Sequence, residues 1–134
     1  MKFIGIWMLV ITFVSCRGGS DVRDKLIGKW RPIKSVEDFN GNGRIDPNDL
    51  YKDPPLDDFF VTFNANGTVI VIYMNDTSEQ TWSLERNNTY LKMISTSGGN
   101  AGMIYEHIDS LTSTSIILKD TSGDLIRWNI WRKQ

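Results

Sequence analysis

Cysteine and histidine are almost missing from this sequence of 134 residues. The chain has one cysteine, Cys16, and one histidine, His107. A single cysteine excludes a disulfide within the chain. A single histidine excludes metal sites built from several imidazoles, and it leaves one candidate base without a Gly-x-Ser-x-Gly pattern to accompany it. We therefore expect a protein that is not an enzyme and has no catalytic residues.

A strong charge of either sign is also lacking. The 15 basic and 16 acidic residues give a formal net charge of -1 with the histidine neutral. Domains that bind nucleic acid carry a basic patch or stripe, and the sequence contains none. We therefore expect no nucleic-acid partner.

The one long apolar run lies at the N-terminus, over residues 3–14. Lys2 precedes this run and Ser15 follows it. The run is too short to span a membrane as a helix, and its pattern is typical of a secretory signal peptide. We predict a signal peptide over residues 1–15, a tether over 16–24 and one domain over 25–134. Removing 15 residues from 134 leaves 119, which is enough for one core without disulfides.

Cys16 stands where a bacterial lipoprotein signal is cut and its new N-terminal cysteine lipidated. The ending Val14-Ser15-Cys16 looks like a lipobox, with Phe13 where leucine is usual. A lipid on Cys16 would hold the domain to a membrane surface without a spanning helix. We predict export across the inner membrane and a lipid anchor in the cell envelope, at the outer membrane. The alternative is a leftover cysteine near an ordinary cleavage site.

Strand patterns dominate the remaining sequence. One short helix is predicted, with Ser20 as its cap, Val22 and Leu26 on one face, and Gly28 at its end. Short β-rich runs follow, separated by residues typical of turns. The predicted strands are 30–37, 59–64, 68–74, 80–85, 89–95, 102–110, 113–119 and 125–132.

The connections between most of these strands are short enough for hairpins, for example residues 64–67, 75–79 and 120–123. Consecutive hairpins form an antiparallel meander. Eight such strands close most simply into an all-β, up-and-down antiparallel barrel, preceded here by a short N-terminal helical turn. A two-sheet sandwich is the alternative.

Three motifs resemble a known family. They are Gly28-Lys29-Trp30 at the first strand, residues 61–68 (VTFNANGT) and residues 81–84 (TWSL). Together they resemble the small lipocalin-like lipoproteins of Gram-negative gut and oral bacteria, over residues 26–132. The resemblance implies an eight-stranded lipocalin-like barrel, in which Gly28 and Trp30 close one end and an arginine of the last strand, Arg127 or Arg132, packs over Trp30.

The same resemblance implies a monomeric, membrane-anchored binding protein that holds a small hydrophobic ligand in its barrel. Residues 38–58 would form a long loop over the barrel mouth. The ligand-binding residues stay open. The alternative is a non-catalytic structural or protein-interaction module of the cell envelope, in which large side chains fill the barrel.

Residues 38–49 (DFNGNGRIDPND) match a calcium-binding loop position by position. Such a loop supplies oxygen ligands from positions 1, 3, 5, 7, 9 and 12 and has glycine at position 6, which is Gly43 here. We predict a structural calcium ion bound by Asp38, Asn40, Asn42, the backbone carbonyl of Arg44, Asp46 and Asp49. Position 12 is aspartate instead of the usual glutamate, and the flanking helices of an EF-hand are missing. The alternative is a surface loop made of turn-forming residues.

Overall fold

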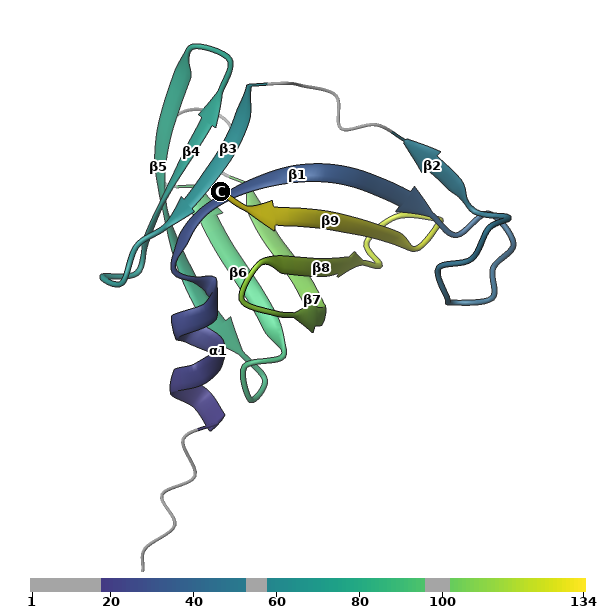
Figure 1. Ribbon diagram of the computed structural model, residues 1–134, viewed down its shortest axis with the longest axis horizontal. Helices are drawn as coiled ribbons and strands as arrows, with labels where there is room; N and C mark the ends of the chain where they lie inside the picture. The colour runs from purple at the N-terminus through teal and green to yellow at the C-terminus, as the bar shows by residue number, and fades with distance from the viewer. Residues whose placement is uncertain (1–17, 53–57, 96–101) are drawn as a thin grey trace, which may run out of the picture.

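The chain forms one helix followed by nine strands in the part that the computed structural model describes, residues 18–52, 58–95 and 102–134. Figure 1 shows the helix below a strongly curved sheet. The elements are α1 (Gly18–Leu26), β1 (Gly28–Glu37), β2 (Leu50–Lys52), β3 (Phe59–Phe63), β4 (Thr68–Tyr73), β5 (Asp76–Glu85), β6 (Tyr90–Ser95), β7 (Met103–Leu111), β8 (Ser115–Asp120) and β9 (Arg127–Lys133).

The sheet closes on itself. Its strand order is β2-β1-β3-β4-β5-β6-β7-β8-β9, every pairing is antiparallel, and β1 also pairs with β9. Strands β1 and β3 to β9 therefore form a closed eight-stranded barrel, with β2 as an addition at the rim. The predicted up-and-down barrel is confirmed, and the two-sheet sandwich is excluded because the described strands belong to one sheet.

Strand β1 has two different neighbours on one of its sides. Its first three residues pair with β3, and its last three pair with β2. Along its other side it pairs with β9 over nearly its full length, with a bulge between Pro32 and Lys34. The bulge resets the alternation of side chains, so both ends of β1 keep a face toward the barrel interior.

The strand boundaries agree with the sequence-based ranges to within two residues, except at the start of β5. Residues 75–79 were expected as a hairpin loop, but β5 begins at Asp76, which pairs with Tyr73. The turn is therefore only Met74 and Asn75, and Met74 has a positive φ of 53°. Residues 76–81 are polar, as is typical of a loop, yet they pair with the whole of the apolar strand β4. Strand β2 was also missed inside the predicted long loop.

Helix α1 begins before the predicted cap. It starts at Gly18, so Ser20 lies inside the helix and most of the expected tether 16–24 is helical. Leu26, at its end, is fully buried, and Val22 and Ile27 pack against the same cluster. The helix therefore contributes apolar side chains to one end of the barrel, which we call the closed end.

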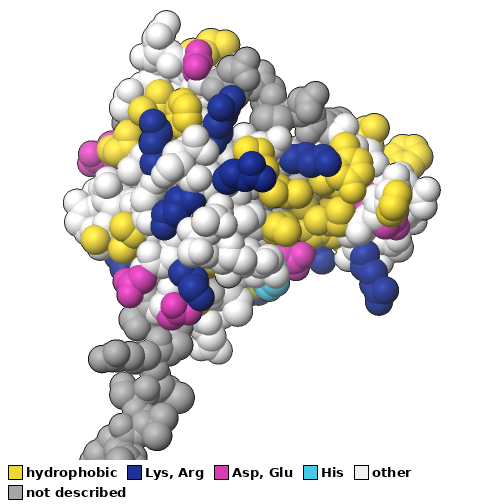
Figure 2. Space-filling model, in the orientation of Figure 1, with side chains coloured by type: hydrophobic (Ala, Val, Ile, Leu, Met, Phe, Trp, Pro, Cys, Tyr) yellow, Lys and Arg dark blue, Asp and Glu magenta, His cyan; other side chains and the backbone are white. Residues whose placement is uncertain are grey.

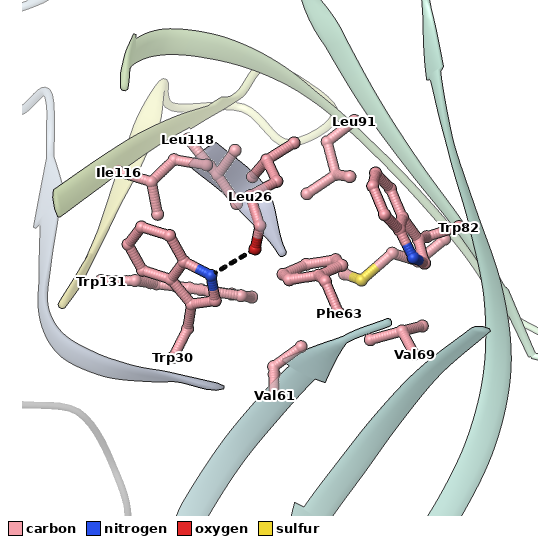
Figure 3. Close-up of a cluster of buried hydrophobic side chains, with 11 residues drawn as sticks. Leu26, Trp30, Val61, Phe63, Val69, Trp82, Leu91, Ile116, Leu118 and Trp131 are labelled. Carbon is pink, nitrogen blue, oxygen red and sulfur yellow. Dashed lines mark hydrogen bonds between the residues drawn. The ribbon is translucent and has the colours of Figure 1, made fainter. Parts of the chain in front are cut away.

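Large aromatic side chains fill the closed end. Trp30, Phe63, Trp82 and Trp131 are all buried there (Figure 3). The rings of Phe63 and Trp82 meet edge to face with centroids 5.3 Å apart. The indole N–H of Trp30 donates to Leu26 O at 2.7 Å, and that of Trp82 donates to Asn64 O at 3.0 Å. Since both buried donors are satisfied, this aromatic packing carries no desolvation penalty from the indoles.

Candidate functional site

The barrel interior changes from apolar to polar toward the end opposite α1, which we call the open end. Trp131 belongs to the core, and residues two apart in a strand share a face, so Asn129 and Arg127 also face inward. Their neighbours across β1, β7 and β8 extend this group. The inner polar cluster consists of Ser35, Glu37, Glu106, Asp120, Arg127 and Asn129.

Hydrogen bonds connect most of the inner polar cluster. Arg127 donates from Nε and Nη2 to Glu37 Oε1, at 3.3 and 2.9 Å. Asn129 Nδ2 donates to Glu106 Oε1 at 3.3 Å, and Ser35 Oγ donates to Asn129 Oδ1 at 3.3 Å. The side chains at the open end are therefore held in place from three strands, β1, β7 and β9.

Glu106 has the most perturbed acid–base equilibrium of the cluster. Its pKa is raised to about 7, chiefly by burial and then by the nearby Asp120 carboxylate, while the Asn129 amide and Arg127 oppose the rise. Glu106 is therefore close to half protonated near neutral pH. A half-buried carboxyl group with a raised pKa is a common feature of ligand-binding and catalytic sites.

Asp120 stays ionised beside it. The Ser122 hydroxyl, which donates to Asp120 Oδ1 at 2.6 Å, lowers the pKa of Asp120; burial opposes this, and the Ser122 N–H and Arg127 add to the lowering. The two carboxyl groups thus respond oppositely to their surroundings. One is held as an anion and the other is free to lose or gain a proton.

A cavity of about 400 Å³ opens beside these two carboxyl groups. Its walls are residues 103–106 at the start of β7 and residues 120–122 at the end of β8. This volume lies above the roughly 300 Å³ at which small-molecule pockets begin. The walls combine carboxyl groups with the apolar side chains of Met103 and Ile104, which are 63% and 42% exposed.

The sequence did not single out this site. Glu106 lies between Ile104 and Ile108 on one face of β7. A charged residue between two inward isoleucines is the pattern from which an inward carboxyl group could have been predicted. Its distant partners Asp120 and Asn129 come from other strands, and only the register of the closed barrel brings them to Glu106.

Trp30 marks the closed end, and a lysine packs over it. Lys133 pairs with Trp30 across the seam between β1 and β9, and its Nζ lies 5.3 Å from the centre of the Trp30 ring. The resemblance implied Arg127 or Arg132 at this place. The structure differs because alternation along β9 turns Arg132 to the exposed outer face, while Arg127 lies at the other end of the strand.

Gly28 is required beside this lysine. It has a φ of +130°, and a Cβ atom at this position would lie 2.6 Å from Lys133 Cε. The Gly-x-Trp pattern in this chain therefore makes room for the cation that packs on the tryptophan.

The loop between β1 and β2 is folded by its own side chains. Asp38 accepts hydrogen bonds from the backbone N–H groups of Asn42 and Gly43, at 3.2 and 2.7 Å. Asn40 Nδ2 and Asn42 Nδ2 both donate to Asp46 Oδ2, at 2.9 and 2.5 Å. Four of the predicted calcium ligands are thus brought into one hydrogen-bonded group.

The other two predicted ligands close the loop. Arg44 N–H donates to Asn42 Oδ1 at 2.8 Å, and Asp49 Oδ2 accepts from Asp46 N–H at 2.7 Å. The amide of Asn40, followed by the N–H of Asn48 and the amide of Asn42, lowers the pKa of Asp46. Among the residues described, no three histidine, cysteine or carboxylate side chains gather as a metal-binding group.

His107 lies on the outer face of β7 and does not line the cavity. Its ring meets Tyr90 edge to face at 5.1 Å, and its Nδ1 lies 3.8 Å from Asp109 Oδ1. The predicted lipidation site, Cys16, lies outside the described residues. No helix within the ranges described is both long enough and apolar enough to cross a membrane.

Two solved structures from Bacteroides are similar to this chain. One is a lipocalin-like protein from Bacteroides uniformis ATCC 8492, with 17% sequence identity, a TM-score of 0.56, and coverage of 82% of this chain and 99% of that chain. The other is an uncharacterized protein from Bacteroides eggerthii DSM 20697, with 15% identity, a TM-score of 0.57, and coverage of 81% and 99%. Neither a protein-family model nor a curated protein sequence matches the chain.

These similarities and the closed barrel define the fold as lipocalin-like. At these identities the likeness concerns the fold alone. The interior of this chain therefore has to be interpreted from its own side chains.

Proposed function

We propose that this chain is a non-enzymatic, membrane-anchored binding protein that holds a small ligand at the open end of its barrel. The observation that carries this proposal is the cavity of about 400 Å³ beside Glu106. A protein that used its barrel only as a scaffold would gain stability by filling this space with apolar side chains, as it does at the closed end. Here the chain keeps the half-buried carboxyl group of Glu106 instead, at a cost in stability.

The lining favours a ligand of mixed character. Met103 and Ile104 supply apolar surface, which agrees with the hydrophobic ligand expected from the sequence. Glu106 and Asp120 supply hydrogen-bond acceptors on the same wall, and the protonated form of Glu106 adds a donor. A small molecule with an apolar body and one polar or basic group fits this lining better than a purely apolar one.

A binding role is favoured over catalysis because the candidate base lies elsewhere. His107 meets Tyr90 edge to face on the outer face of β7 and is not one of the residues that line the cavity. The two carboxyl groups at the cavity are instead fixed by Asn129 and Ser122, as expected for groups that orient a ligand.

The anchoring part of the proposal depends on Cys16 and is tested separately. Cells that express the full chain would be labelled with an alkyne analogue of palmitic acid. The wild-type protein should take up the label and sediment with membranes, whereas Cys16→Ser should do neither. Unlabelled wild-type protein would remove the anchor from the proposal and leave ligand binding unaffected.

Ligand binding is tested with a cavity-filling variant. The protein is purified without detergent and examined by native mass spectrometry for a bound small molecule, and it is then titrated with the fluorescent apolar amine N-phenyl-1-naphthylamine. Ile104→Trp should abolish retention of both. Ile70→Trp is the matched control, because Ile70 follows the inward Val69 on β4, so it faces outward, and it pairs with Thr62 and Glu79, away from β7 and β8. Equal binding by the wild type and both variants would contradict the proposal.

A second candidate function rests on the outer surface. Apolar side chains gather over β1, β8 and β9 (Figure 2). Ile117 and Ile130 are cross-strand partners on β8 and β9, and both face outward because their neighbours Ile116, Leu118 and Trp131 belong to the core. This surface and the filled closed end favour a protein-interaction module of the cell envelope. Loss of a partner from Ile130→Lys, together with normal behaviour of Ile104→Trp, would favour this second function.

The calcium-ordered loop expected from the sequence is proposed separately. Its residues do not line the cavity, so the two sites can be tested independently.

A further inference from the structure

We infer that the loop from Asp38 to Asp49 is a calcium-binding site. The barrel holds both ends of this loop. Glu37 and Leu50 are partners in the β1–β2 ladder. Asp38 follows Glu37 and Asp49 precedes Leu50, so the backbones of the two aspartates extend from neighbouring strands that lie about 5 Å apart. Asp38 N–H also donates to Ile126 O at 2.9 Å, which fixes this end against the barrel.

Both terminal aspartates are withdrawn from water. Asp38 is 1% exposed and Asp49 is 6% exposed. Burial at the two ends of one hairpin deprives both carboxylates of their hydration. Such an arrangement is stable only where positive charge or many hydrogen bonds compensate it.

The hydrogen bonds within the loop compensate the burial of the Asp38 carboxylate but only part of that of Asp49. Both oxygens of Asp38 accept backbone N–H groups, whereas only Oδ2 of Asp49 has a partner. Asp49 Oδ1 is buried and has no hydrogen-bond partner. An orphaned carboxylate oxygen in a buried position is a group that a cation would satisfy.

The remaining groups of the loop suit calcium. Asp46, Asn40 and Asn42 are already in contact, and Gly41 and Gly43, with φ of 70° and 74°, allow the tight bends between them. The donor set has three carboxylates, two amides and one backbone carbonyl, without sulfur or imidazole. Hard oxygen donors in a flexible loop favour calcium over zinc, and over the strict octahedral geometry of magnesium.

Ion binding would exchange existing contacts for coordination. The amide groups of Asn40 and Asn42 now point Nδ2 at Asp46, so each must turn its oxygen toward the ion. This exchange and the short Asp49 side chain at position 12 reduce the affinity. We expect a dissociation constant of about 0.1 to 1 mM, the range of extracellular calcium modules.

The site would also fix the rim of the barrel. Glu37, which accepts two hydrogen bonds from the half-exposed Arg127 at the open end of the barrel, is the residue directly before Asp38. An ion that holds Asp38 therefore holds the end of β1 and its side chain in the inner polar cluster. Calcium binding would stabilise the open end without contributing a ligand to the cavity.

Thermal unfolding of the full mature chain tests the site. Calcium at roughly ten times the dissociation constant should raise the Tm by about 5 °C over a chelator, and the same concentration of magnesium should have a much smaller effect. Asp49→Asn should remove the calcium-dependent shift. Asp24→Asn, an exposed aspartate on α1, is the control and should keep it. A wild-type Tm that does not respond to calcium would overturn the inference.

Terbium luminescence gives a second readout that does not depend on stability. Tyr51 Oη donates to Asp46 O at 3.3 Å, so its ring lies close enough to sensitise a bound terbium ion. Terbium emission should appear on binding, decrease when calcium competes, and weaken in Tyr51→Leu. Asp46→Asn, in the exposed part of the loop, replaces Asp49→Asn if that variant does not fold. Emission that calcium does not displace, or that survives in the aspartate variants, would also overturn the inference.

Discussion

Lys133 lies directly across the seam of the barrel from Trp30, with its Nζ 5.3 Å from the centre of the indole ring and 2.9 Å from Lys25 O, to which it donates. One cation therefore joins the last strand, the first strand and the end of α1. This contact closes the barrel where its first strand, β1, meets its last strand, β9.

Replacement of Lys133 should weaken this closure. Lys133→Ala removes the cation–π contact and leaves the Lys25 carbonyl without its partner, so it should lower the free energy of unfolding by about 1 to 2 kcal/mol. Arg132→Ala, one residue away on the exposed face, should change it by less than about 0.5 kcal/mol. Urea denaturation followed by tryptophan fluorescence measures both. If Arg132→Ala lowered the free energy of unfolding more than Lys133→Ala, the cation that closes the barrel would be Arg132, as the resemblance implied.

Gly28→Ala should be destabilising for two reasons. The φ of +130° is unfavourable for alanine, and its Cβ would lie 2.6 Å from Lys133 Cε. We expect a loss of about 1 to 3 kcal/mol in the same denaturation experiment. Part of this loss should disappear in the Lys133→Ala background, where the steric conflict is absent but the backbone strain remains. Fully additive losses would mean that the side chains do not meet.

Leu26→Ala should separate the helix from the barrel. Leu26 is fully buried in the core cluster, and truncation of such a side chain costs about 2 to 5 kcal/mol. Leu125→Ala is the control, because Leu125 is 46% exposed. Calorimetry should show a lower Tm for the first variant and an almost unchanged Tm for the second. Equal Tm values would show that α1 does not contribute to the stability of the barrel.

Glu106 should make stability depend on pH. Its pKa is raised from 4.5 to about 7 in the folded protein, so the folded state holds the proton more tightly than the unfolded chain does. The associated stability is complete below about pH 4.5 and is lost as the pH rises toward and through 7. Glu106→Gln should therefore be more stable than the wild type at pH 8, by on the order of 2 kcal/mol, and similar to it at pH 4.5.

The control for this experiment is Glu79→Gln, an exposed glutamate on β5. Its difference from the wild type should stay small and constant across the pH range. If Glu106→Gln followed the wild-type curve as closely, the pKa of the Glu106 carboxyl group would not be raised in the folded protein.

Alternation of apolar and polar residues was sufficient to predict the barrel. Trp82 and Leu84, or Trp128 and Ile130, mark strands because period-two patterns are local properties of the sequence. Strand β2 was not predicted because it has only three residues, and the side chains of Leu50 and Tyr51 are both exposed, so no alternation of apolar and polar residues marks it. Its pairing depends on β1, which lies 13 or more residues away along the chain.

The cavity was less predictable than the fold. The inward direction of Glu106 could be read from its isoleucine neighbours, but its raised pKa depends on burial and on Asp120. The cation over Trp30 was missed for the same reason, since the choice among Arg127, Arg132 and Lys133 is a question of register between β1 and β9. Local sequence patterns predict on which face of a strand a side chain lies, whereas the register between strands in the closed barrel determines which side chains it contacts.

The change of neighbour along β1 implies that the two ends of the barrel differ in cooperativity. Between Gly28 and Trp30 the strand is flanked by β3 and β9, but between Ser35 and Glu37 its second neighbour is only the three-residue strand β2. The strands at the open end can therefore separate locally while the aromatic side chains at the closed end stay packed. Backbone amides at the rim should exchange with deuterium orders of magnitude faster than those beside Trp30, so access to the interior need not require the molecule to unfold.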